Sequence, residues 1–274
     1  MFRTPASGFR AERVIAGIAA CILFSALSLS AGGEAAFKGE ITDSKCAALG
    51  GHTAMLDKGE TNAHCTIACV KAGAKYVLED SANKIIYQLD DQKRPEAFAA
   101  EDVVVVGTLD RSSNTIHVDD IVRDLPATVK QAKSVAIICD SCPRMMAKAK
   151  RAAFEQLTDW NHFTVVPDPT NADLIFLFSA NPYLGDYVTR DGPDKRPVIV
   201  DTTYLNVVDP RTGKSFWGDF GQAGAWFVSS ATRDLIDEFR AQLEMDENPA
   251  QEQLFIDHHR VAKAAPLIDA TVGK

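Results

Sequence analysis

The densest group of metal-binding and redox-active side chains lies in the first third of the chain and consists of Cys46, His52, His64, Cys65 and Cys69. A helix predicted over residues 63–72 carries Cys65 and Cys69 four positions apart, so both side chains share one face. Two thiolates could then point at one zinc or copper(I) ion, with Cys46 and His52 completing four ligands. The pattern is that of a soft-metal site.

A disulfide is the competing interpretation of the same cysteines. It would join Cys46, at the end of a predicted strand, to Cys65 or Cys69. We favour it over a metal site because disulfides persist in an oxidising compartment, where the export signal described below would place the chain. A link across about 20 residues would contribute roughly 3 kcal/mol to the stability of a small domain. Under this interpretation no cofactor is expected.

A second cysteine pair, Cys139 and Cys142, stands at the end of a predicted strand and the start of a predicted helix. Amides at a helix N-terminus stabilise a thiolate, so such a pair could catalyse thiol-disulfide exchange. The sequence has no Trp or Gly-Pro beside the pair, and Pro167 is poorly placed to face it. We therefore favour a local disulfide or two incidental cysteines over catalysis.

Weaker candidates for ligand contact occur in a predicted loop over residues 181–197 and in a glycine-rich stretch that follows it. Long loops are often functional, and aromatic side chains beside glycines can be displayed at a surface. These candidates are Tyr183, Tyr187, Arg190 and Trp226. The adjacent His258 and His259 fall in a polar segment, where a solvated helix is expected and metal binding is the less favoured interpretation.

The first 36 residues have the three-part layout of a secretory signal peptide. Three arginines precede an apolar run from Val14 to Leu29, and small residues follow as far as Ala36. With about 16 residues, the run is shorter than the roughly 20 that a permanent transmembrane helix needs. We expect cleavage between Gly33 and Ala36. The residues around Cys21 resemble a lipobox, but lipid attachment there would leave only about seven apolar residues upstream, so we favour the cleaved form.

Export places the mature chain in the periplasm or outside the cell, with no transmembrane span. Removal of the leader changes the formal net charge from -8 to about -9, because it takes away three basic and two acidic residues. An acidic surface repels phosphate backbones and argues against nucleic acid as the partner. Without Cys21 the cysteine count is odd, so at least one thiol is free, metal-bound or shared between chains.

The distribution of strand and helix signals predicts an α+β protein with two domains. Residues 37–122 are predicted to form a small OB-like β-barrel with one helix. Residues 123–133 contain Pro126 and lack periodicity, which is typical of a linker. Residues 134–246 are predicted to form an α/β sandwich with a mixed sheet, and residues 247–274 a polar C-terminal tail.

Individual elements follow from hydrophobic periodicity and from turn and capping residues, such as Thr61 before the cysteine-bearing helix. The predicted strands are 37–41, 76–78, 84–89, 103–109, 115–122, 134–139, 163–166, 174–178, 204–208 and 215–217. The predicted helices are 63–72, 144–157 and 232–245.

Three N-terminal segments carry a resemblance to a known family: FKGEITDSKC at 37–46, CTIACVKAGAKY at 65–76, and residues 104–110. They resemble an uncharacterised family of small exported bacterial barrel proteins over about residues 37–122. The resemblance implies an exported OB-like barrel but no activity. Five residues separate Cys46 from His52, more than in the family, so the family's histidine is not assigned to His52.

The segments 171–178 and 205–217 resemble a group of bacterial envelope proteins, many of them lipoproteins, over about residues 133–245. That resemblance implies an assembly role or none that is assigned. The Thr-Gly-Lys turn at 212–214 is not a phosphate-binding loop, because the glycine-rich run and the following helix are absent from the sequence.

These features favour a non-enzymatic, exported two-domain protein with a binding or assembly role in the cell envelope. Its partner would be an envelope protein or a small ligand. A thiol-disulfide oxidoreductase using Cys139 and Cys142, and zinc or copper binding by the Cys46 group, are the alternatives.

Overall fold

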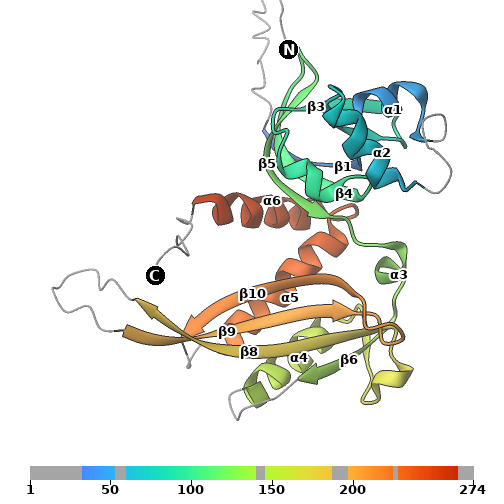
Figure 1. Ribbon diagram of the computed structural model, residues 1–274. Coiled ribbons are helices and arrows are strands. Elements are labelled where there is room, and N and C mark those ends of the chain that lie inside the picture. Colours follow the sequence, from blue (N-terminus) through green and yellow to red (C-terminus); the bar gives the residue numbers. More distant parts are fainter. Residues whose placement is uncertain (1–32, 53–59, 140–145, 187–196, 225–227, 265–274) are drawn as a thin grey trace, which may run out of the picture. The chain divides into compact units, whose positions relative to one another are not determined.

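The chain contains two β-sheets with helices packed against them, as Figure 1 shows. The computed structural model describes residues 33–52, 60–139, 146–186, 197–224 and 228–264. Strands β1 to β5 form a closed five-stranded sheet, and β6 to β10 form a five-stranded sheet of mixed direction, which we call the open sheet. The predicted α+β class is confirmed.

The closed sheet has the strand order β1-β2-β3-β5-β4. Residues 34–40 of β1 pair with β4, and residues 40–43 of the same strand pair with β2, so β1 joins the two ends of the sheet. The pairs are antiparallel except for β3 with β5, which is parallel. The strands are β1 (Glu34–Asp43), β2 (Tyr76–Asp80), β3 (Ile85–Leu89), β4 (Asp102–Asp110) and β5 (Thr115–Arg123).

Strand β4 is buried on both faces, and its side chains alternate between two cores as the pleat of a strand requires. Val103 and Val105 lie in the core of the closed sheet with residues such as Ile41 and Leu78. Val104 and Val106 point the other way, into a second apolar cluster. The run of four valines therefore reflects burial on both faces of this part of the strand.

Short helical segments lie between the strands of the closed sheet. The β1–β2 connection contains α1 (Ser44–Leu49) and α2 (Asn62–Lys71), and η2 (Arg94–Phe98) lies between β3 and β4. Helix α2 is the predicted cysteine-bearing helix, and Thr61 caps it by accepting a hydrogen bond from the His64 amide at 3.2 Å. Helix α1 was not predicted, because six residues are too few to show helical periodicity.

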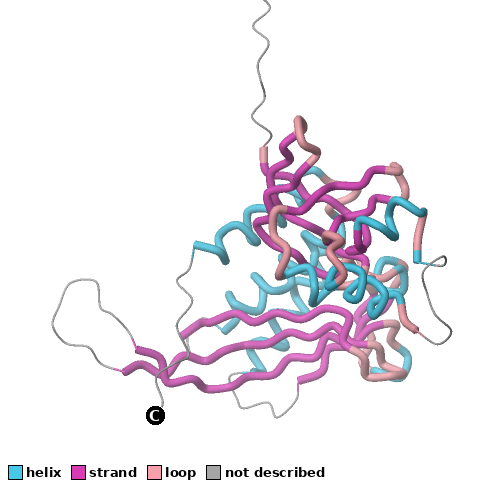
Figure 2. Tube along the Cα trace, turned by 45° about the horizontal axis from the view of Figure 1, so that its top comes forward, coloured by secondary structure: helices cyan, strands magenta, loops and turns pink. Residues whose placement is uncertain are grey.

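The open sheet has the order β10-β9-β8-β6-β7, and Figure 2 shows its strands as neighbouring magenta tubes. β6 is parallel to β7 and β8, whereas β8, β9 and β10 are antiparallel, which confirms the predicted mixed sheet. Its core contains Phe176, Phe178 and Phe239. The elements are β6 (Ser134–Cys139), α4 (Met146–Trp160), β7 (Thr164–Val165), η3 (Pro169–Asn171), β8 (Leu174–Asp186), β9 (Pro197–Val208), β10 (Ser215–Gly224) and α5 (Val228–Glu244).

The predicted loop over residues 181–197 is wrong in its extent. Strand β8 continues to Asp186 and β9 begins at Pro197, so Tyr183 lies on a strand in register with Val200. Pro182 and Gly185 within β8 hide the strand from a pattern-based prediction, because both residues are typical of turns. Tyr187, Arg190 and Trp226 lie outside the described residues.

The predicted linker and the predicted polar tail both pack against the rest of the chain. Within the linker, Leu125 and Val129 of the segment around α3 (Ala127–Lys130) are buried in the core of the open sheet. Within the tail, α6 (Pro249–Ala264) buries Phe255 and Ile256 against β4. On the other side of α6, Gln253, Asp257 and Arg260 are exposed, as expected for a helix at a surface.

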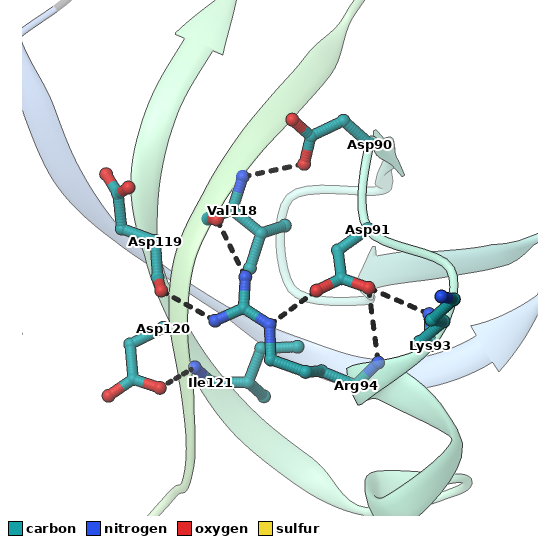
Figure 3. Close-up of polar contacts among 8 residues, drawn as sticks. All are labelled: Asp90, Asp91, Lys93, Arg94, Val118, Asp119, Asp120 and Ile121. Carbon is teal, nitrogen blue, oxygen red and sulfur yellow. Dashed lines mark hydrogen bonds and ion pairs between the residues drawn. The ribbon is translucent and has the colours of Figure 1, made fainter. Parts of the chain in front are cut away.

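Arg94 fastens η2 to strand β5, as Figure 3 shows. Its Nη1 donates a hydrogen bond to the Asp119 carbonyl at 2.6 Å, and its Nη2 donates one to the Val118 carbonyl at 2.9 Å. Its Nε pairs with the Asp91 carboxylate, and the neighbouring Asp90 accepts from the Val118 amide at 2.8 Å. Because the β3–β5 ladder spans only two residue pairs, these bonds complete the closure of the sheet.

We predict that Arg94→Met lowers the unfolding free energy by about 2 kcal/mol, because it removes charge-assisted hydrogen bonds to two carbonyls and a carboxylate. Arg94→Lys keeps the charge but cannot reach both carbonyls with one planar group, so an intermediate loss is expected. The control is Arg111→Met in the exposed β4–β5 turn. Urea unfolding checks the order, and equal stabilities for the Arg94 and Arg111 variants would contradict it.

Candidate functional site

Three thiols meet in the β1–β2 connection of the closed sheet. Cys46 lies on α1, and Cys65 and Cys69 lie one turn apart on α2. Their exposed fractions are 0%, 4% and 9%, respectively. With Ala74 they form a small apolar cluster of their own. The structure therefore brings together three of the residues that the sequence singled out.

Asp43, the last residue of β1, positions Cys46. Its Oδ1 accepts hydrogen bonds from the Lys45 and Cys46 amides, both at 3.0 Å, and so caps the N-terminus of α1. The short helix ends at Gly50, which adopts a left-handed conformation with a φ of 78°. Both ends of α1 are thus fixed, and the Cys46 side chain has little freedom to move away from α2.

The spacing of the sulfur atoms suits a shared metal ion. Cys46 Sγ and Cys65 Sγ are 3.8 Å apart, and all three Sγ atoms lie within 4.8 Å of one another. Zinc-sulfur bonds of about 2.3 Å place tetrahedral sulfur ligands roughly 3.8 Å apart. The observed spacing therefore needs little adjustment to accept an ion.

Two buried polar atoms beside the thiols have no hydrogen-bond partner: Asp43 Oδ2 and His52 Nδ1. The other ring nitrogen of His52, Nε2, lies 3.1 Å from Glu40 Oε1. A histidine held by a carboxylate through one nitrogen has its second nitrogen oriented for a metal. Ligand atoms of Asp43, Cys46 and His52 also lie within 4.8 Å of one another. Buried polar atoms are normally paired, so these two atoms are available to interact with a ligand.

Burial and the neighbouring carboxylate favour the protonated form of the Cys46 and Cys69 thiols in the absence of a cation. Burial is the main cause that raises the pKa of Cys46, and the nearby carboxylate of Asp43 raises it further. The pKa of Cys69 is also raised, again first by burial and then by the charge of Asp43. A bound cation would reverse this preference, because metal-bound thiols are deprotonated.

The predicted disulfide from Cys46 to Cys65 or Cys69 stays a prediction. All three thiols are unbonded in the structure, and 3.8 Å between Cys46 Sγ and Cys65 Sγ exceeds the disulfide length of about 2.05 Å. The proximity suits both a metal and a disulfide, and the two uses of these sulfur atoms exclude each other.

The other sequence candidates do not join this group. His64 is largely exposed and pairs with Glu60 at 3.2 Å. Cys139 ends β6 in register with Phe178 and is disulfide-bonded, while Cys142 lies outside the described residues. Whether the CxxC pair catalyses redox exchange therefore stays untested.

Sequence reasoning missed Asp43 and Glu40 as part of the site. The spacing Asp43-x-x-Cys46 is that of a helix cap and its third helical residue, and it could have predicted α1. No comparable signal exists for Glu40, whose contact with His52 depends on how the segment after α1 folds back to β1.

The chain matches no protein-family model and no curated protein. Among solved structures it is similar to the PelC dodecamer from Paraburkholderia phytofirmans, with a TM-score of 0.28, 15% identity and coverage of 41% of this chain and 90% of that chain. A minor lipoprotein from Acinetobacter baumannii gives a TM-score of 0.26 with 10% identity over 42% and 94% of the chains. Lipoprotein B from Nitrosomonas europaea gives 0.23 with 12% identity over 52% and 90%.

These neighbours are bacterial, and two of the three are lipoproteins. Among the described residues, no helix is long and apolar enough to cross a membrane.

We predict that Asp43→Ala destabilises the protein by about 1–2 kcal/mol, because it removes the cap of α1. Asp43→Asn retains an oxygen acceptor for the Lys45 and Cys46 amides and should destabilise less. Chemical unfolding under reducing conditions without metal measures both. Equal stability of the alanine variant and the wild type would show that the cap does not hold α1.

A second prediction concerns oxidation of the metal-free protein. Cys46 should bond to Cys65 or Cys69, because its helix lies beside α2, whereas residues four apart on one helix meet disulfide geometry poorly. Peptide mapping under non-reducing conditions identifies the bond. A Cys65–Cys69 bond, or three thiols that stay free under oxidation, would contradict the prediction.

Proposed function

We propose that this chain is an exported, non-catalytic binding protein of the cell envelope whose closed sheet holds one thiophilic metal ion, copper(I) or zinc. The ion would bind between Cys46, Cys65 and Cys69. The observation that carries the proposal is the set of three buried thiols at metal-ligand spacing beside Asp43 Oδ2, a buried oxygen without a partner. Soft thiolates select these metals over calcium or magnesium.

The donor set favours copper(I) as the first candidate. The three sulfur atoms form one close group, whereas His52 groups with Asp43 and Cys46. Structural zinc is almost always four-coordinate, so zinc would need His52 or Asp43 to move in as a fourth ligand. Copper(I) needs no such movement if three thiolates suffice. Cys46 belongs to both groups and would be a ligand in either case.

The strand order β1-β2-β3-β5-β4 with a parallel β3–β5 pair supports an OB-type barrel for the closed sheet. In OB folds the β1–β2 connection contributes to the binding surface. The thiols lie in this connection, so the proposed metal site occupies the position that such folds use for ligands. The second, open-sheet domain would supply the contacts to an envelope partner.

The N-terminal arginines and apolar run support export, and the start of β1 at Glu34 supports cleavage before that residue. A cut further along would remove strand residues that pair with β4. Capture of a soft metal ion in the periplasm or outside the cell would then be the role of the closed sheet.

We predict that the mature protein, reduced and loaded anaerobically with copper(I), binds one equivalent that Cys69→Ser fails to retain. Loss of one of three thiolates should weaken binding at least a hundredfold, because a soft ion then lacks a donor that water replaces poorly. Competition with a chromophoric copper(I) chelator measures the affinity, and elemental analysis measures the stoichiometry. The same titration with zinc ranks the two metals.

The matched control is His64→Gln, which changes an exposed residue next to Cys65 outside the thiol group. It should bind copper(I) like the wild type. Asp43→Asn tests the unpartnered oxygen. This variant should keep the cap of α1 but bind copper(I) with an altered affinity. Equal retention by wild type and Cys69→Ser, or a Cys46 disulfide in protein isolated from its native envelope, would contradict the proposal.

A further inference from the structure

Asp219, Glu238 and His258 converge from three separate elements although they are far apart in the sequence. Asp219 lies on β10, Glu238 on α5 and His258 on α6. The burial of Phe255 and Ile256 against β4 fixes the rotation of α6. That rotation directs His258, one turn further along, toward the two carboxylates.

The distances between the donor atoms match those around a metal ion. His258 Nε2 lies 3.0 Å from Glu238 Oε1 and 3.8 Å from Asp219 Oδ2, and all three donor atoms lie within 4.8 Å of one another. Nitrogen and oxygen ligands at about 2.0–2.2 Å from an ion stand roughly 3–3.6 Å apart. A small shift of Asp219 toward His258 is sufficient to bring the three donor atoms to the spacing of ligands around one ion.

The charge of the group also calls for a cation. The side chain of Glu238 is only 8% exposed, and its carboxylate lies against that of Asp219. Two adjacent carboxylates repel each other, and a divalent ion would relieve that repulsion more completely than one histidine can.

One side of the group is open to solvent and to further ligands. The three residues line a cavity of about 1050 Å³ that also contains Asp120 and His259. His259 is already engaged with Asp120 at 2.8 Å. Three protein ligands with an open side leave room for water molecules to complete the coordination shell.

We propose that Asp219, Glu238 and His258 bind a divalent metal ion of the manganese or zinc class, which fastens α6 to β10 and α5. Carboxylate and imidazole donors suit these ions, in contrast to the soft-metal thiol group. This site is separate from the proposed function and does not depend on it. Its consequence is that the C-terminal helix, which also covers β4, is held in place by an exchangeable ion.

The test uses Mn²⁺ with the full mature chain at pH 7.5, because thiols are poor ligands for this ion and the Cys46 group should not interfere. Loss of the free-ion signal in electron paramagnetic resonance measures binding. One ion per chain is expected, with zinc displacing it. Asp219→Asn and Glu238→Gln should each weaken binding at least tenfold, and Mn²⁺ should raise the Tm of the wild type but not of these two variants.

The matched control is His117→Asn, which changes an exposed histidine paired with a carboxylate on the closed sheet. It should bind Mn²⁺ like the wild type. Asp219→Asn removes a repulsive charge, so it should fold, and circular dichroism in a chelator checks this. The absence of saturable Mn²⁺ binding to the wild type, or unchanged binding to a folded Asp219→Asn variant, would overturn the proposal.

Discussion

The buried carboxylate of Asp43 is the constraint on which the thiol site depends. It stands where β1 ends and α1 begins, and it is fully buried. One oxygen is committed to the first amides of α1, which fixes Cys46, while the other has no partner and lies beside the thiols. Burying a carboxylate costs free energy unless both of its oxygens interact with charged or polar groups. A metal ion bound by the cysteines would supply that interaction. Asp43 would then serve both the fold of the β1–β2 connection and its proposed metal binding.

The closed sheet explains why this connection can hold a defined shape. Residues 34–40 of β1 pair with β4 and residues 40–43 pair with β2, so the ladder with β2 fixes the point at which β1 ends. The weaker parallel contact between β3 and β5 is supplemented by Arg94 and the aspartates around it. Helix α6 covers Val104 and Val106 of β4. This face of the strand is therefore shielded from water and needs no polar residues. A rigid sheet beneath a long connection is the arrangement in which buried ligands can be pre-positioned.

Local sequence signals predicted the elements that depend on local physics. The β-branched run around Val103 and the cap at Thr61 predicted a strand and a helix close to those observed. The density of cysteines predicted that Cys46, Cys65 and Cys69 could meet. Features set by distant contacts could not be predicted: β8 runs through Pro182 because it pairs with β9, and α6 is covered because β4 offers an apolar face. The group formed by Asp219, Glu238 and His258 belongs to this second kind, since no spacing in the sequence connects the three residues.

X-ray absorption spectroscopy of the copper(I)-loaded mature protein tests the central claim most directly, because it reports which atoms surround the ion. The account predicts a first shell of three sulfur atoms at about 2.3 Å, which is lost when Cys46 is replaced by serine. A shell of nitrogen and oxygen atoms alone, or one that is unchanged in Cys46→Ser, would contradict it.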